Sequence, residues 1–167
     1  MFYTPFQVTR YSAEYFLWAR KEQKVGHYYN YELMKEINGG TQMRDVWTLP
    51  AIAPWEKSCG KHPTQKPLCV LSRIIQASTK PGAWILDPFT GSSTTGIAAT
   101  LLGRRFLGID QEEKFLEMSK ARREELDSIR RRGEILEKLD KQAKIFQDSD
   151  IRVLCEPEVY YGPELPF

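Results

Sequence analysis

Two carboxylates, each at the end of an apolar segment, are the first chemical signal in the chain. Asp87 follows the run at 84–86, and Asp110 comes 23 residues later, directly after the segment 105–109. An offset of roughly 20 residues is the spacing at which an acidic side chain meets ribose hydroxyls in nucleotide-binding βαβ units. Between the two acids, the small residues Gly91-Ser92-Ser93 let a ligand approach the backbone. The pattern predicts a nucleoside site.

A strand, a tight turn, a helix and a second strand must position these groups. Pro88 has no backbone donor for a sheet ladder, so the first strand is expected to end at Asp87. Ser93 or Thr94 can cap the helix that follows, and Gly103 closes that helix. We therefore predict one βαβ half-unit between residues 84 and 110.

More specific motifs lie on both sides of this turn. The segment His62-Pro63-Thr64-Gln65-Lys66-Pro67 precedes an amphipathic helix, after which come DPFTGSSTTG and GID. In this order the chain resembles the β class of amino-group DNA methyltransferases, whose cofactor region runs HPTQKP, helix, DPFxGSGTT, helix, and GIE or GID. The resemblance covers about Glu14 to Arg123. Ser93 departs from it, because the family usually has glycine there and the loop loses backbone freedom.

The resemblance implies an α/β fold, the Rossmann-like fold of S-adenosylmethionine-dependent methyltransferases. Only the segments near 15–20, 83–87 and 105–110 have convincing strand patterns. A complete methyltransferase sheet needs more strands than these. We therefore expect an incomplete sheet.

The same resemblance divides the chain. Residues 1–123 correspond to the C-terminal portion of a methyltransferase, with a target-recognition region at 22–60 and a cofactor-binding part at 61–123. Residues 124–167 are expected to form a charged helical extension and a proline-rich tail. Within the extension, Gly133 is a possible break, so the pattern fits either one helix or two helices in series.

S-adenosylmethionine is the cofactor that the resemblance implies. Asp110 would accept from the ribose diol, while Asp87 and the turn at Gly91 would face the middle of the ligand. Lys66 and Thr64 would hold its amino-acid end. NAD fits less well, because a loop that begins with an acid repels phosphates and suits a cationic sulfonium; in an unrelated sequence Asp87 would merely cap a turn. The predicted cofactor-binding set is Thr64, Lys66, Asp87, Phe89 (against the adenine ring or the pocket wall), Gly91, Ser92, Ser93, Thr94 and Asp110.

The region 22–60 interleaves cations with aromatic rings, which suits a surface that binds phosphates and stacks on bases of double-stranded DNA. A local core under a loop is the competing interpretation. Two further strands are expected, a buried one at 14–21 and one at 43–49. The predicted DNA-binding residues are Lys24, Tyr28, Arg44, Trp47 and Lys57.

The catalytic loop of the family is missing from the sequence. The family holds the target amino group with a (D/N/S)PP(Y/F) loop, and no two of the ten prolines here are adjacent. We predict a DNA methyltransferase that acts on the adenine amino group rather than cytosine. Alone it should be inactive, and it should need a complementary N-terminal half or self-association. The alternatives are a non-catalytic remnant or DNA-recognition subunit, and an unrelated nucleotide-binding module.

Length and composition bound these hypotheses. The 167 residues suffice for one domain, and a formal net charge of +2 is too small to indicate nucleic-acid binding by itself. No apolar run approaches the roughly 18 residues of a membrane span. The three cysteines lack CxxC spacing and only His27 could partner His62, so we predict a cytoplasmic protein without a metal site, and a structural role for His62.

Overall fold

Two parallel strands joined by a helix form the centre of the molecule. The computed structural model describes residues 13–22 and 24–145. Trp84 of the first strand lies opposite Arg105 of the second, and Asp87 lies opposite Gly108. This confirms the predicted strand, turn, helix and strand, and with them the α/β class. In chain order the elements are α1 (Tyr31–Ile37), η1 (Pro54–Lys57), α2 (Leu68–Ser78), β1 (Trp84–Asp87), α3 (Thr94–Leu101), β2 (Arg105–Gly108), α4 (Glu113–Glu124), η2 (Glu125–Asp127) and α5 (Ile129–Ile145).

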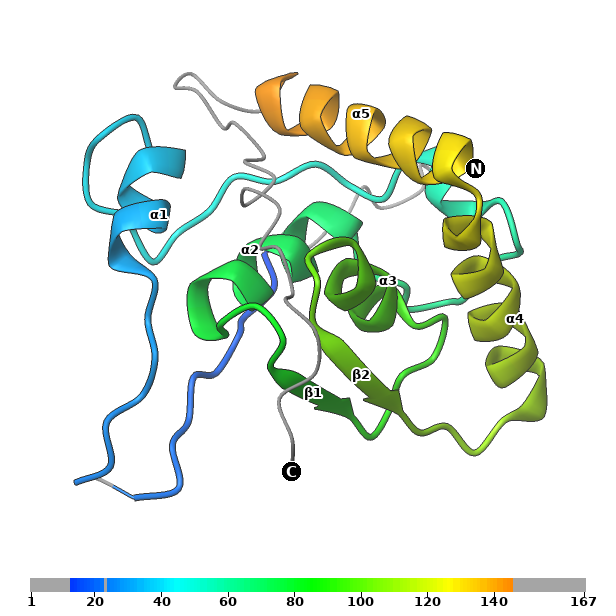
Figure 1. Ribbon diagram of the computed structural model, residues 1–167, viewed down its shortest axis with the longest axis horizontal. Helices are drawn as coiled ribbons and strands as arrows, with labels where there is room; N and C mark the ends of the chain where they lie inside the picture. Colours follow the sequence, from blue (N-terminus) through cyan, green and yellow to red (C-terminus); the bar gives the residue numbers. More distant parts are fainter. Residues whose placement is uncertain (1–12, 23, 146–167) are drawn as a thin grey trace, which may run out of the picture.

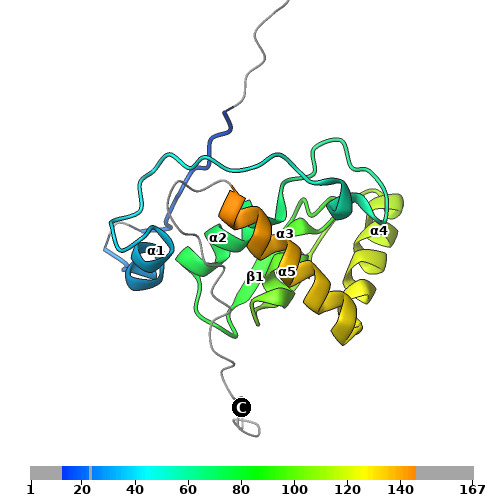
Figure 2. The same cartoon turned by 90° about the horizontal axis from the view of Figure 1, so that it is seen from above.

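The helices cover one side of the sheet in layers (Figure 1). α3 lies against both strands, and α2 packs beside α3. α5 crosses over α2, and α4 flanks α3 (Figure 2). Apolar side chains repeat at helical spacing along α2, which packs on α3 and α5, whereas α3 is buried on nearly every side. The core comprises Leu68, Cys69, Val70, Ile75, Ile97, Ala98, Ala99, Leu101, Leu126, Ile135 and Leu139.

The opposite side of the sheet exposes large apolar side chains. Trp84, Leu86 and Leu107 are 68%, 61% and 55% exposed. Parallel sheets are normally covered on both faces, and two strands alone are rarely stable. Within the described residues the sheet is therefore incomplete, as the sequence predicted.

The expected strands at 14–21 and 43–49 are not present, so both predictions were wrong. The described residues of both segments lack regular secondary structure, and Tyr15 and Leu17 are more than 90% exposed. A strand forms only where a neighbour completes its hydrogen bonds, and no strand in the described part of the chain lies beside either segment. The short helix α1, capped by Asn30, was not predicted; Met34 and Ile37 bury its inner side.

The sequence left open whether the charged region forms one helix or two in series, with Gly133 as a possible break, and the structure has no break at Gly133. α4 passes into η2, and α5 begins after Ser128, whereas Gly133 lies inside α5. Burial of Leu126 at this corner fixes the turn. The proline-rich tail lies outside the described residues. None of the helices in the described ranges has the length and hydrophobicity that a membrane span requires.

Candidate functional site

The Asp87 carboxylate at the end of β1 is fixed by two hydrogen bonds. Its Oδ1 accepts from the Phe89 backbone N–H at 3.1 Å, and its Oδ2 accepts from Thr95 Oγ1 at 2.7 Å. The first bond closes the turn, and the second places the carboxylate at the N-terminus of α3. Asp87 therefore shapes the loop between β1 and α3 as well as giving it negative charge.

Asp110 connects this loop to the end of β2. Its Oδ2 accepts from the Gly91 backbone N–H at 2.8 Å, and its Oδ1 accepts from the Glu112 N–H at 2.9 Å. These backbone donors, that of Glu112 first, lower the pKa of the Asp110 carboxyl below its usual value. The two acids thus lie on adjacent loops at the carboxyl ends of adjacent parallel strands, which is where open α/β sheets bind ligands.

The segment at 62–67 packs on the same loop. A Cβ atom on Gly91 would lie 2.9 Å from His62 Nε2, so only glycine permits this contact, and Gly91 has φ +50°. The His62 ring also meets the Phe115 ring edge to face, with centroids 4.2 Å apart, and His62 Nδ1 accepts from the Thr64 N–H at 3.3 Å. His62 therefore joins the two sequence motifs through packing.

Phe89 and Thr64 are the exposed members of the predicted set, and Lys66 is half-buried. Lys66 Nζ forms an ion pair with Glu14, at 3.0 and 2.9 Å from its two carboxylate oxygens. Phe89 is 85% exposed. Ser92, Ser93 and Thr94 are buried at the start of α3. Thr64 is exposed, with its Oγ1 3.4 Å from His62 Nδ1.

Ser93 has a left-handed backbone, with φ 56° and ψ 37°, at the N-cap of α3, and its side chain makes no capping bond. A left-handed backbone costs a non-glycine residue about 1–2 kcal/mol of folding free energy. Glycine avoids this steric cost, although it loses more conformational entropy on folding.

We expect Ser93→Gly to raise the free energy of unfolding by about 0.5–1 kcal/mol, measured by urea denaturation. Ser92→Gly is the matched control, because among the described non-glycine residues only Ser93 has positive φ. The control should lower stability, and the same effect from both substitutions would contradict the assigned strain.

Two buried charged residues of the site escaped the sequence analysis. Glu56 in η1 is 3% exposed and accepts from the backbone N–H groups of Ala53 and Leu68 at 3.1 and 2.7 Å, so it caps α2. Arg122 in α4 is 7% exposed and donates to Ser92 O and Thr94 Oγ1. The sequence carries no capping-box signal for Glu56, because Ala53 has no side-chain oxygen, and the bond that Glu56 accepts from the Leu68 N–H depends on the tertiary fold.

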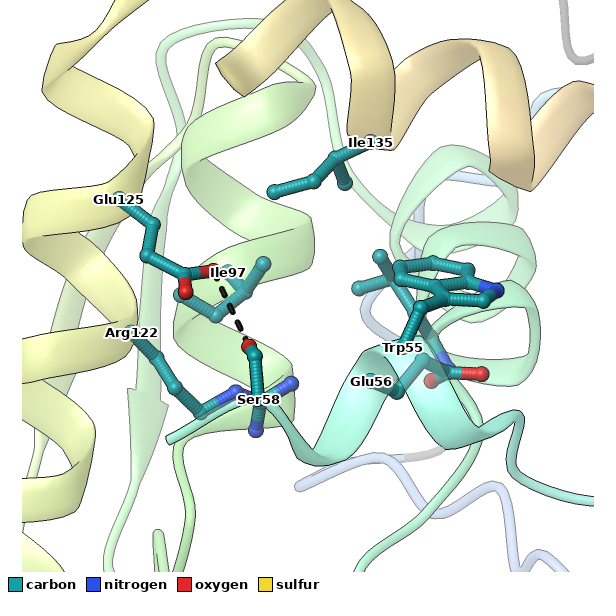
Figure 3. Close-up of a pocket in the computed structure, with 8 residues that line it drawn as sticks. Trp55, Glu56, Ser58, Ile97, Arg122, Glu125 and Ile135 are labelled. Atoms are coloured by element: carbon teal, nitrogen blue, oxygen red, sulfur yellow. Dashed lines mark hydrogen bonds between the residues drawn. The ribbon is translucent and has the colours of Figure 1, made fainter. Parts of the chain in front are cut away.

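A small pocket lies beside these two residues (Figure 3). Its volume is about 20 Å³, which is room for roughly one water molecule, so it is too small to hold a nucleoside. Ser58 Oγ donates to Glu125 at 3.3 Å, and both residues line the pocket. Its lining residues are Trp55, Glu56, Ser58, Leu68, Ile97, Arg122, Glu125 and Ile135.

The structure brings together only part of the predicted DNA-binding set. Trp47 Nε1 donates to the Arg44 carbonyl at 2.7 Å, and the Trp47 ring lies under the Arg73 guanidinium. The Tyr28 ring faces the Lys80 ammonium. Lys24 is exposed in the N-terminal segment, and Lys57 ends η1. No group of three or more potential metal-ligating side chains occurs within the described residues.

Comparison with known proteins identifies the family of the chain. Residues 3–121 match the family model N6_N4_Mtase, described as DNA methylase. The chain is 54% identical over 132 residues to the Type II methyltransferase M2.MboI of Moraxella bovis, covering 79% of this chain and 48% of that protein. It is 59% identical over 114 residues to M2.DpnII of Streptococcus pneumoniae, covering 68% and 42%. The chain therefore spans less than half the length of these relatives.

Among solved structures, the chain is similar to that of the M1.HpyAVI–SAM complex. The sequence identity is 33% and the TM-score is 0.46, over 59% of this chain and 45% of that one.

Proposed function

Because the chain belongs to the N6_N4_Mtase family of DNA methylases, we propose that it forms the methyl-donor site and part of the DNA-contact surface of a site-specific DNA methyltransferase. The donor is S-adenosylmethionine and the acceptor is the exocyclic amino group of adenine. The observation that carries the proposal is the meeting of three loops. Asp110 binds the Gly91 N–H, and His62 packs on the same glycine.

The chemistry of this cradle fits the donor. Asp87 and Asp110 give negative charge at the carboxyl ends of the strands, which suits a cationic sulfonium and a ribose diol and disfavours a diphosphate. Thr90 Oγ1, in the same loop, is buried with no hydrogen-bond partner in the described part of the chain. When bound, the cofactor supplies the electrophilic methyl group. The protein's own residues bind and orient it.

We assign the donor's amino-acid end to Lys66 and Thr64, at the start of α2. In the structure the Lys66 ammonium is paired with the Glu14 carboxylate. When the donor binds, its own carboxylate would take the place of Glu14. Phe89, which is largely exposed, would gain burial by covering the adenine ring. The remaining predicted residues, Ser92, Ser93 and Thr94, shape the loop beneath the ligand.

The catalytic loop must come from outside these 167 residues, because the sequence has no Pro-Pro pair. We propose a complementary methyltransferase segment as the partner. The exposed apolar sheet face at Trp84, Leu86 and Leu107 is where such a segment would pack, since a parallel sheet is stable only with both faces covered. We assign contact with double-stranded DNA to Lys24, Tyr28, Arg44, Trp47 and Lys57.

Calorimetric titration tests the assignment of the ligand. The chain should bind S-adenosylmethionine and its demethylated product in preference to NAD. Tighter binding of NAD would favour the unrelated nucleotide-binding module. If neither ligand binds, with or without the complementary segment, the proposed function is wrong.

Asp110→Ala should weaken S-adenosylmethionine binding by about 1–3 kcal/mol, the range for a charge-assisted hydrogen bond. Because the pKa of Asp110 is lowered in the folded state, the stabilisation that it gives the fold is complete above the usual carboxyl pKa. That stabilisation is lost as the pH falls through the lower pKa, so affinities are compared near neutral pH. Glu112→Gln is the control, since this neighbouring acid is exposed and pairs with Lys114. Unchanged affinity in the folded Asp110 variant would remove it from the ribose role.

A further inference from the structure

Two side chains of α4 hold the loop that precedes α3. Ser119 Oγ donates to the Gly91 carbonyl at 2.8 Å. One turn later on the same side of the helix, Arg122 donates to the Ser92 carbonyl at 2.5 Å and to Thr94 Oγ1 at 3.1 Å. We call Ser119 and Arg122 the loop clamp.

The clamp uses a buried charge for a task that a neutral donor could perform. Arg122 is 7% exposed, and burial lowers the pKa of its guanidinium, while the charge of Glu56 acts in the opposite direction. Glu56 is itself buried and caps α2 directly after the segment at 62–67. The two charges therefore connect α4 to both segments of the donor site. A buried charge costs desolvation energy, so we attribute Arg122 to the selection of one loop conformation rather than to added stability.

The clamp surrounds the strained residue. Ser93, with φ 56°, lies between the two residues that Arg122 holds. A non-glycine residue keeps a left-handed backbone only where its surroundings over-determine it. The contacts on Gly91, Ser92 and Thr94 are such surroundings, and the Asp110 bond to Gly91 fixes the loop from the other side.

We propose that Ser119 and Arg122 are positioning residues for the methyl donor. Neither touches the ligand, and both act by fixing the backbone of residues 91–94 in the conformation that receives it. The inference rests on the proposed function, and it assigns to α4 a part in cofactor affinity.

The test measures loop order and cofactor affinity separately in the full chain. Arg122→Met should speed amide hydrogen exchange at 91–94 without ligand and weaken S-adenosylmethionine binding about ten-fold or more. Arg122→Lys and Ser119→Ala, which keep part of the clamp, should show smaller changes of the same kind. Arg123→Met is the surface control, because the neighbouring arginine pairs with Asp127 at an exposed site. Ile75→Val, a core change in α2, is the control for stability.

The outcomes separate the clamp from the proposed function. If Arg122→Met weakens binding no more than Ile75→Val does for the same loss of unfolding free energy, Arg122 is only structural and the proposal is overturned. If the wild-type chain binds no S-adenosylmethionine, with or without the complementary segment, the proposed function fails. In that case amide hydrogen exchange at 91–94 still tests whether Ser119 and Arg122 order the loop. Equal exchange rates in Arg122→Met and the wild type would overturn the proposed clamp.

Discussion

Replacing Asp87 by alanine should weaken S-adenosylmethionine binding at least ten-fold. Removing a charged hydrogen-bond acceptor costs about 1.5–3 kcal/mol, and about 1.4 kcal/mol is a factor of ten. The carboxylate holds the Phe89 N–H and Thr95 Oγ1, so the variant loses both the turn geometry and the negative charge beside the sulfonium.

Asp87→Asn separates these two contributions. The amide keeps the shape and one acceptor oxygen, so it should preserve most of the turn while losing the charge. Calorimetry on folded proteins should therefore rank the affinities as wild type, then Asp87→Asn, then Asp87→Ala. Wild-type affinity in a folded Asp87→Ala protein would show that the donor binds elsewhere.

The isolated 167-residue chain should transfer little or no methyl to DNA, even where it binds the donor. Donor binding alone does not stabilise the transition state; a flipped base must also be held in line with the methyl group. Co-expression with a complementary half that carries a (D/N/S)PP(Y/F) loop should restore transfer of labelled methyl groups. Asp87→Ala in this chain should then abolish the restored activity.

Two controls accompany this experiment. A complementary half with its catalytic motif mutated should bind this chain without restoring activity, which separates assembly from chemistry. Robust turnover by the isolated chain would contradict the shared-site account. Assembly without turnover, with both loops intact, would favour the non-catalytic remnant or recognition subunit.

The centre of the fold was predictable because its signals are local. Pro88 stops a strand, Gly103 ends a helix, and the offset between Asp87 and Asp110 reflects one βαβ unit. The approach of the 62–67 segment to Gly91 was not readable from spacing alone. It followed from the motif order, and the structure adds its cause, the absence of a side chain where the His62 ring packs.

The errors in prediction have non-local causes. The aromatic segment at 14–21 has strand propensity, but propensity forms no strand where no neighbour pairs with it. Arg122 resembles any other charge on a helix that is mostly solvated, and only the packing of α4 reveals that it is buried. The break between α4 and α5 follows burial of Leu126 rather than the presence of Gly133.

The most direct test of the central claim identifies the atom that receives the methyl group. DNA incubated with the reconstituted protein and labelled S-adenosylmethionine would be digested to nucleosides and analysed by mass spectrometry. The expected product is N6-methyladenine, and Asp87→Ala should abolish its formation. The central claim would be contradicted by N4-methylcytosine as the sole product, or by unmodified DNA from an assembly that binds both donor and DNA.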